Sequence, residues 1–179
     1  QVVRAVLLNP GNKENGGIFS QVQPWAVMAE CMLGHGKRAY EYYRAFMPSA
    51  QNDRADTREI EPYVHCQSTH SPHSRKYGAS RLPWLTGTAA WAYYSASAYI
   101  MGLRPSVGGL TIDPCIPSDW KAFSMERILR GKRIKIAVEN PDGVEHGVKS
   151  LAVGDETIKG NFLPNEKMEG VTEVAVKMG

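Results

Sequence analysis

The chain has 179 residues, a length typical of one ordinary domain or of one domain with part of another. Its hydrophobic fraction of 42% and its charged fraction of 22% are values of globular proteins, which excludes a disordered chain. The net charge of +3 is too small, and the basic residues are too scattered, to indicate binding to nucleic acid.

Three cysteines, Cys31, Cys66 and Cys115, lie far apart and show no metal-ligand spacing such as Cys-x-x-Cys. We therefore expect buried free thiols in a cytoplasmic protein. We find neither a signal-peptide pattern nor an apolar run long enough to span a bilayer. The sequence lacks an initiator Met and opens on an apolar, strand-like run at residues 2–8, so we expect one piece of a longer polypeptide.

Two helices are predicted after a loop at residues 9–17 that is rich in Gly and Asn. Apolar side chains recur at helical spacing in residues 24–33, and an aromatic stripe recurs in residues 37–47. Glycines at 34 and 36 end the first helix, and Pro48 ends the second. Because only a few residues separate them, the two helices are expected to form an antiparallel hairpin.

A third helix is expected from about Pro83 to Gly102, after two polar loops at residues 49–61 and 68–80. The first of these loops alternates in charge, which favours exposure to solvent. Many of the helix residues are small, which allows close packing against neighbours, so we expect a long, buried helix.

The second half of the chain is predicted to be β-structure. Short β-prone runs, separated by turns with Pro-Asp-Gly, Gly-Asp and Glu-Gly, occur at residues 110–112, 128–139, 148–153 and 171–177. The chain is therefore expected to have an α+β fold with two domains, residues 1–107 and residues 108–179.

The best candidate for an anion site is the segment Thr86-Gly87-Thr88 at the predicted start of the third helix. Amides at a helix start have no partner within the helix, and the helix dipole adds partial positive charge. Gly87 has no side chain to block a ligand, and the two threonines offer hydroxyl groups. The alternative is a turn with small packing residues, which composition alone slightly favours.

Other polar residues near this segment allow several readings. Gln67 could bind two neighbouring sugar hydroxyls, although a lone Gln is more often surface. His65, His70 and His73 lack helical ligand spacing, so surface or packing roles are favoured over a metal site. Hydrolysis by two carboxylates has three candidates that nothing singles out, namely Glu14, Glu59 and Glu61. No catalytic-triad signature, phosphate loop or dinucleotide fingerprint is visible.

Several blocks of the sequence resemble one family, in the same order along the chain. They are NPGNKENGGIF at 9–19, AYEYYR at 39–44, EPYVHCQ at 61–67, WLTGTA at 84–89, GLRP at 102–105, IDPCIP at 112–117, VENPDGV at 138–144 and GN at 160–161. On these blocks the chain is similar to the inverting disaccharide phosphorylases, glycoside hydrolase family 94. The resemblance covers essentially the whole chain.

This resemblance carries expectations about the fold. Members of the family are long chains with an N-terminal β-sandwich, an (α/α)6 barrel and a small C-terminal β domain. It implies that residues 1–107 are the last helices of the barrel and that residues 108–179 are the β domain. It also implies that the general acid, an Asp, lies in an earlier part of the barrel, outside this chain.

The resemblance also implies roles for individual residues. Thr86 and Gly87 would hold phosphate, Gln67 would bind the sugar in the glycone subsite, and Lys13 would reach the sugar on the acceptor side. Gln21 stands where the family usually carries a phosphate-binding His. Because a Gln amide cannot become cationic near neutral pH, this departure puts phosphate affinity, and with it phosphorolysis, in question.

The reaction implied is reversible, inverting phosphorolysis of a β-linked disaccharide such as chitobiose or cellobiose to a sugar 1-phosphate. Phosphate would be the co-substrate, with no metal or other cofactor. The expected partners are the N-terminal remainder of the enzyme and, when complete, a second copy in a homodimer, but neither nucleic acid nor membrane. The alternatives are a non-catalytic carbohydrate-binding remnant and a glucan-synthase-type member of the family. An incomplete barrel exposes apolar helix faces, so the isolated chain is expected to associate or aggregate.

Overall fold

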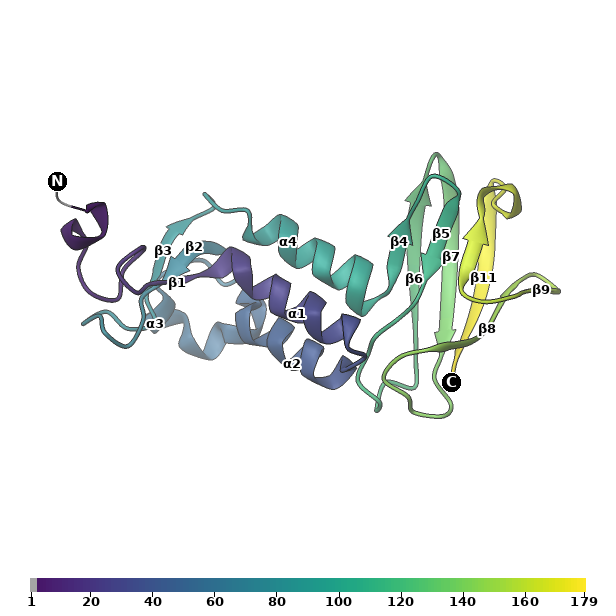
Figure 1. Ribbon diagram of the computed structural model, residues 1–179, viewed down its shortest axis with the longest axis horizontal. Coiled ribbons are helices and arrows are strands. Elements are labelled where there is room, and N and C mark those ends of the chain that lie inside the picture. Colours follow the sequence, from purple (N-terminus) through teal and green to yellow (C-terminus); the bar gives the residue numbers. More distant parts are fainter. Residues whose placement is uncertain (1–2) are drawn as a thin grey trace. The chain divides into compact units, whose positions relative to one another are not determined.

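The computed structural model describes residues 3–179, which divide into two compact units. Unit 1 comprises the residues up to Val27 together with Glu41–Tyr94, and unit 2 comprises Met28–Tyr40 together with Ser95–Gly179. Helices come first along the chain and the larger sheets follow, so the predicted α+β fold is confirmed (Figure 1). The units follow spatial contacts rather than sequence domains, and the predicted boundary between residues 107 and 108 stays a prediction.

The elements up to Ile100 are mostly short. In chain order they are η1 (Arg4–Leu7), β1 (Ile18–Phe19), η2 (Ser20–Val22), α1 (Gln23–Met32), α2 (Gly36–Phe46), η3 (Pro48–Arg54), α3 (Ala55–Arg58), β2 (Cys66–Thr69), β3 (Ser80–Pro83), α4 (Thr88–Tyr94) and the π-helix η4 (Ser95–Ile100). Helices α1 and α2 match the predicted helices. Gly34, with a φ of +79°, follows the end of α1, and Pro48 follows the end of α2, as the stop signals predict.

The small sheet of unit 1 has the order β1-β2-β3, with both pairs antiparallel. Phe19, where β1 ends, pairs with Ser68, and Pro83, where β3 ends, pairs with Cys66. The chain therefore leaves β1 and β3 at the same end of the sheet, next to the start of β2. Two segments far apart in sequence, η2 and the turn before α4, are placed near each other in this way.

Unit 2 contains two further sheets. Its elements after Ile100 are β4 (Leu103–Pro105), β5 (Gly109–Ile112), β6 (Ala122–Leu129), β7 (Lys132–Glu139), β8 (Val148–Val153), β9 (Glu156–Ile158), β10 (Phe162–Pro164), η5 (Asn165–Lys167) and β11 (Val171–Met178). The strand orders are β10-β5-β4 and β6-β7-β11-β8-β9, and β7 with β11 is the one parallel pair of the described ladders.

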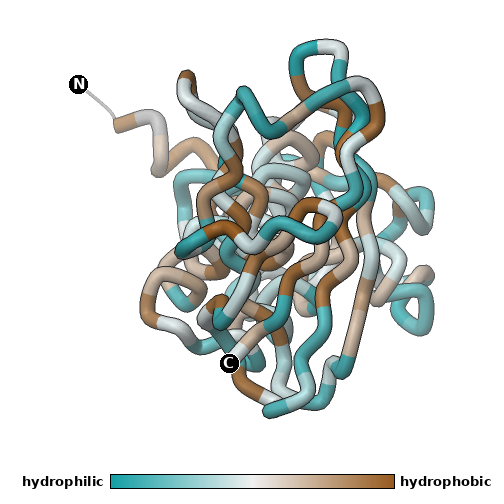
Figure 2. Tube along the Cα trace, turned by 90° about the vertical axis from the view of Figure 1, so that its right-hand side faces the viewer, coloured by the Kyte–Doolittle hydropathy of each residue, from teal (hydrophilic) through white to brown (hydrophobic). Residues whose placement is uncertain are grey.

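Strands β7 and β11 of the five-stranded sheet bury one face by alternation. Ile134, Ile136 and Val138 of β7 are at most 1% exposed, whereas the residues between them are exposed. Val174 of β11 lies opposite Ile136 and is equally buried. Figure 2 shows this alternation of apolar and polar residues along the strands. A tight turn at Arg130, where φ is +51°, joins β6 to β7 in the left-handed conformation that hairpin turns favour.

Four sequence-based expectations were wrong, two about the segments 2–8 and 49–61 and two about the third helix. The run at residues 2–8 is not a strand: residues 4–7 form the 3₁₀ helix η1, and residues 1–2 lie outside the described part of the chain. Backbone bonds from Val6 to Val3 and from Leu8 to Ala5 satisfy its polar groups locally, without a neighbouring strand. The segment 49–61 is not only a loop, because it contains η3 and α3.

The third helix begins at Thr88, not near Pro83. Pro83 is the last residue of β3, where pairing with β2 holds the chain extended. The helix buries only one face: Thr88, Ala92, Ser95, Ala98 and Ile100 are buried, whereas Tyr93 is 60% exposed. Within residues 3–179, none of the helices is both long enough and apolar enough to cross a membrane.

Candidate functional site

Thr86 and Gly87 lie in a tight turn between β3 and α4. Trp84, with a φ of +68°, opens this turn, and its backbone N–H donates to the carbonyl of His65 at 3.2 Å. The Thr86 Oγ1 accepts a hydrogen bond from the backbone N–H of Thr88 at 3.1 Å and lies 2.7 Å from the Thr88 Oγ1. The Thr86 side chain therefore caps the start of α4, and Gly87 leaves the turn open to solvent.

Gln21 reaches the same turn from η2. Its Oε1 lies 3.7 Å from the point that a Cβ on Gly87 would occupy, which is ordinary contact distance. Gln21 and Gly87 are both exposed, so their polar groups are accessible. The three residues predicted to hold phosphate thus lie together, although Gln21 is far from Thr86 and Gly87 in the sequence. The sheet topology explains this, because η2 and the turn leave the sheet at the same end.

Gln67 is the second residue of β2, on the strand that the other two flank. The Thr88 Oγ1 donates to the carbonyl of Cys66 at 3.4 Å, which ties the start of α4 to this strand. Cys66 and Ser68 are buried on either side of Gln67, which is itself half-buried. Alternation along the strand therefore sends the Gln67 side chain to the face opposite these neighbours.

Lys13 belongs to a separate, tightly hydrogen-bonded loop. The N–H of Gly17 donates to the carbonyl of Lys13 at 2.8 Å, and Lys13 has a φ of +44°. The carbonyl of Gly11 accepts from the backbone N–H of Ser71 at 3.0 Å, so the loop is fastened to the segment after β2. Among the contacts of the described residues, none joins the Lys13 side chain to Gln21, Gln67 or Gly87. The structure thus places Gln21, Thr86 and Gly87 at one end of the sheet and Gln67 on its central strand. Lys13 lies in a separate loop that is bonded to the segment after β2.

His65 is half-buried and His70 is buried, and the pKa of each is lowered. His70 is 7% exposed, its Nδ1 lies 2.8 Å from the Ser74 Oγ, and its Nε2 is buried without a partner. Burial lowers the pKa of His70, and the charge of Arg81 lowers it further. Burial likewise lowers the pKa of His65, with the charge of Arg58 adding to the effect. Across residues 3–179, no group of three His, Cys, Asp or Glu side chains is arranged to hold a metal ion.

Two of the candidate carboxylates have structural partners. The Glu61 Oε1 accepts a hydrogen bond from the Trp84 Nε1 at 3.3 Å, and the Glu59 Oε2 lies 3.7 Å from the Lys76 Nζ. The first contact helps to hold Trp84 in its left-handed backbone conformation at the entrance of the turn. Glu61 is therefore part of the support of the predicted phosphate site.

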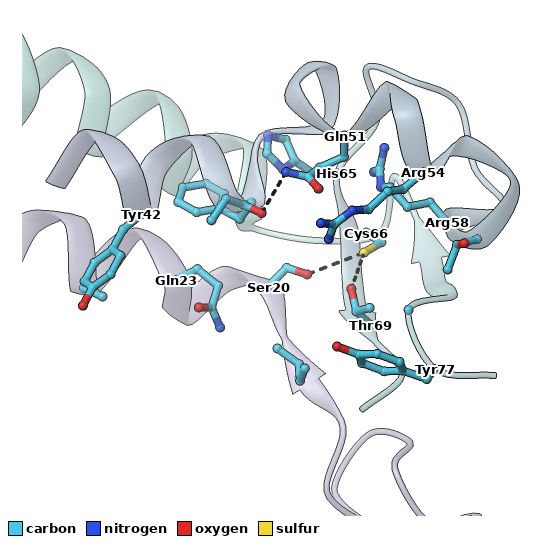
Figure 3. A pocket seen from close by; sticks show the side chains of 16 residues that line it. Ser20, Gln23, Tyr42, Gln51, Arg54, Arg58, His65, Cys66, Thr69 and Tyr77 are labelled. Carbon is cyan, nitrogen blue, oxygen red and sulfur yellow. Dashed lines mark hydrogen bonds between the residues drawn. The ribbon is translucent and has the colours of Figure 1, made fainter. Parts of the chain in front are cut away.

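A cavity of about 1000 Å³ also lies in unit 1, and sequence reasoning missed it (Figure 3). Its polar side chains include Ser20, Gln51, Arg54 and Arg58, and the Ser20 Oγ lies 3.5 Å from the Cys66 Sγ. None of the five predicted site residues lines it, although Ser20 precedes Gln21 and Cys66 precedes Gln67. The two arginines lie in the alternating charges of residues 49–61, a pattern that indicated only exposure.

Comparison with known proteins agrees with the resemblance of the sequence blocks. Residues 1–102 match the family model of the glycosyl hydrolase 94 superfamily, catalytic domain, and residues 103–152 match that of the glycosyl hydrolase family 65, C-terminal domain. Proteins named N,N'-diacetylchitobiose phosphorylase, from Vibrio proteolyticus and Vibrio furnissii, are 43% and 45% identical over 94% and 83% of this chain. A solabiose phosphorylase from Paenibacillus borealis is 30% identical over 87% of it. The matched regions are 21%, 18% and 20% of those proteins, so the chain spans about a fifth of their length.

Proposed function

Since the chain belongs to the glycosyl hydrolase 94 superfamily, whose catalytic domain matches residues 1–102, we propose that it supplies part of the substrate site of an inverting disaccharide phosphorylase. In this proposal, Gln21, Thr86 and Gly87 bind phosphate. Gln67 binds the sugar whose anomeric carbon reacts, and Lys13 binds the sugar that leaves. The general acid comes from a part of the enzyme outside these residues.

The position of the Gln21 side chain beside Gly87 is the observation that supports this proposal. It places a side-chain amide beside an exposed glycine at the start of a helix, with the Thr86 hydroxyl next to it. Backbone N–H groups at a helix start and neutral hydroxyl and amide donors are suitable ligands for an oxyanion. Polar groups from two segments then lie beside one exposed turn.

The proposed reaction is a direct displacement. A phosphate oxygen forms a bond to the anomeric carbon while the glycosidic bond breaks on the opposite face, and the departing oxygen receives a proton from the general acid. The donors of Gln21, Thr86 and Gly87 offset the charge of the phosphate and orient one oxygen for attack. The Thr88 hydroxyl donates to the carbonyl of Cys66, the residue before Gln67, which supports a role of Gln67 on the sugar that phosphate attacks.

The names of the relatives support our proposal for the two sugars of the substrate. The proteins that are 43% and 45% identical are named for N,N'-diacetylchitobiose, whereas the solabiose phosphorylase is 30% identical. We therefore favour N-acetylglucosamine 1-phosphate and N-acetylglucosamine as the products of phosphorolysis, with the glucose pair as the second choice. Phosphate is the co-substrate in both cases.

The reverse reaction tests the proposal directly. The full-length protein that carries this chain is incubated with N-acetylglucosamine 1-phosphate and N-acetylglucosamine, and in parallel with glucose 1-phosphate and glucose, while released phosphate is measured. Phosphate release that requires both the sugar 1-phosphate and the free sugar supports phosphorylase activity. The pair that reacts faster identifies the preferred sugar. If neither pair releases phosphate while the protein still binds chitobiose or cellobiose in calorimetry, it is a carbohydrate-binding remnant instead.

Partners and location are part of the same proposal. Unit 1 exposes large apolar side chains, with Trp84 66%, Leu85 69% and Trp25 47% exposed. We propose that other parts of a longer chain cover them, that the complete enzyme is a homodimer, and that it works in the cytoplasm. Size-exclusion chromatography of the isolated chain should then show species larger than a monomer. A monomer that unfolds cooperatively would contradict this assignment of the exposed face.

A further inference from the structure

Two cysteines of unit 2 face one cavity. Cys31 lies in the last turn of α1, and Cys115 lies in the segment that follows β5. Both line a cavity of about 470 Å³, together with Arg104, Asp113 and His146. Neither forms a disulfide, and Cys115 is only 4% exposed, whereas Cys31 is partly accessible.

Close backbone packing holds the two cysteines in place. The backbone N–H of Cys115 donates to the carbonyl of Ile100 at 2.9 Å, and Cys115 pairs with His146 in an antiparallel bridge. The turn after α1 packs on the same residues: a Cβ on Gly34 would meet the ring of His146, and a Cβ on Gly36 would meet the backbone of Ile116. Both positions therefore require glycine, and the turn after α1 packs closely against His146 and Ile116.

The two thiols also interact. The hydrogen bond between the side chains raises the pKa of Cys31, and it lowers that of Cys115. These directions favour the protonated form of Cys31 and the thiolate form of Cys115. Burial and the charges of Glu145 and Asp113 oppose the lowering of the Cys115 pKa, while Arg104 and Glu30 act on the pKa of Cys31 in opposite directions. A thiolate beside a protonated thiol is a suitable arrangement for stepwise oxidation.

We propose that Cys31 and Cys115 form an oxidisable dithiol site that reacts with hydrogen peroxide. The Cys115 sulfur attacks one peroxide oxygen, the O–O bond breaks, and hydroxide leaves, which gives a sulfenic acid on Cys115. The Cys31 sulfur then attacks the Cys115 sulfur, the S–O bond breaks, and a second hydroxide leaves. The two thiol protons convert both hydroxides to water, so one peroxide is reduced while two thiols are oxidised to one disulfide.

The disulfide would link the end of α1 to the segment after β5 and close a long loop. Crosslinks across long loops restrict the unfolded chain most, so the oxidised protein should melt at a higher temperature than the reduced protein. Cys66 offers an internal comparison. It is buried in unit 1, where its Sγ lies 3.5 Å from the Ser20 Oγ and 3.7 Å from the Thr69 Oγ1.

The test treats the full-length protein with hydrogen peroxide, with and without dimedone, and maps cysteines by mass spectrometry of a non-reducing digest. Wild type and Cys66→Ser are expected to give one peptide pair joined through Cys31 and Cys115, which dithiothreitol separates. Cys31→Ser should instead accumulate a dimedone adduct on Cys115, because the resolving thiol is missing. Cys115→Ser should leave Cys31 as a free thiol under the same conditions.

Two results would overturn the proposal. One is that Cys31 and Cys115 stay reduced at peroxide concentrations that already oxidise Cys66. The other is that they join only to other molecules or to other cysteines of the protein. The melting temperature gives a second readout: a rise on oxidation in wild type and Cys66→Ser, reversed by dithiothreitol and absent in both other variants, supports the disulfide. An equal rise in all four proteins contradicts it.

Discussion

The two units of the molecule use their side chains differently. In unit 2, strands β7 and β11 bury an alternating apolar face on which Ile134, Ile136 and Val174 are at most 2% exposed. In unit 1, large apolar residues such as Trp84 are exposed, while polar residues such as Ser68 and His70 are buried. Unit 2 therefore has an alternating sheet face as its core, whereas unit 1 combines exposed aromatic side chains with buried polar ones.

Backbone strain and unpaired polar atoms are concentrated in unit 1 as well. Leu82 and Trp84 have φ angles of +50° and +68°, which bulky residues rarely adopt, and they stand just before the predicted phosphate turn. The Ser68 Oγ, the Ser71 Oγ and the His70 Nε2 are buried without a partner. Such features cost free energy and persist at functional sites, where the surrounding structure holds them. We propose from this difference that unit 2 stabilises the fold and that unit 1 carries the phosphate site, and four changes test it.

The largest effect is expected in the core of unit 2. Ile136→Ala should lower the free energy of unfolding by about 2–5 kcal/mol, because it removes a fully buried side chain and leaves a cavity. Ile128→Ala on the neighbouring strand β6 is the control, since Ile128 is 63% exposed and its loss should change the value by less than about 0.5 kcal/mol. Urea denaturation measures both. Equal losses in the two variants would show that the alternating face is not the stabilising core.

Gly87→Ala should raise the KM for phosphate and leave the fold unchanged. An added Cβ would lie 3.7 Å from the Gln21 Oε1 and 3.8 Å from the Trp91 Cδ1, so the turn has room for it. The methyl group would occupy the approach of phosphate, and losing one or two hydrogen bonds to a charged ligand weakens binding about 10- to 100-fold. The KM for phosphate measures this. Gly108→Ala, also exposed and without a left-handed φ, is the control and should leave the KM unchanged.

Gln21→His should strengthen phosphate binding by a few-fold. A protonated imidazole adds positive charge that the Gln amide lacks, and the gain should be present below the unperturbed His pKa of about 6.5 and fade as pH rises through it. The phosphate KM at pH 6 and at pH 8 measures the effect, with Gln23→His on the next helix as the comparison. An unchanged KM at both pH values would refute the placement of Gln21 in the site.

The smallest effect concerns pH and the buried histidines of unit 1. Burial lowers the pKa of His70 in the folded state, so the unfolded chain binds more protons in acid. Stability should therefore be full above the unfolded pKa of about 6.5 and fall as pH decreases below it. Melting temperatures at pH 7.5 and 5.5 should differ more for wild type than for His70→Asn. His73→Asn is the control and should keep the wild-type difference in melting temperature between the two pH values. If this difference is also lost in His73→Asn, then His70 is not its source.

Local patterns predicted the elements whose signals lie within a few residues. Pro48 and Gly34 marked helix ends, and the alternation in β7 marked a half-buried strand, because capping and side-chain period depend only on neighbours in sequence. The strands β1, β2 and β3 were missed, since two to four residues are too few to establish a period. Their pairing also displaced the predicted helix start from Pro83 to Thr88.

For the candidate site, too, the sequence identified residues, and the tertiary structure decided their contacts. By itself, the sequence identified the α+β class, the family, and Gln21, Gln67, Thr86 and Gly87 as residues of interest. Tertiary structure alone decided that Gln21 lies beside Gly87, that Thr88 fastens the turn to the strand of Gln67, and that Cys31 and Cys115 line one cavity. The reason is physical: residue types and short spacings record local conformational preferences, whereas contacts between distant segments depend on how strands pair and helices pack.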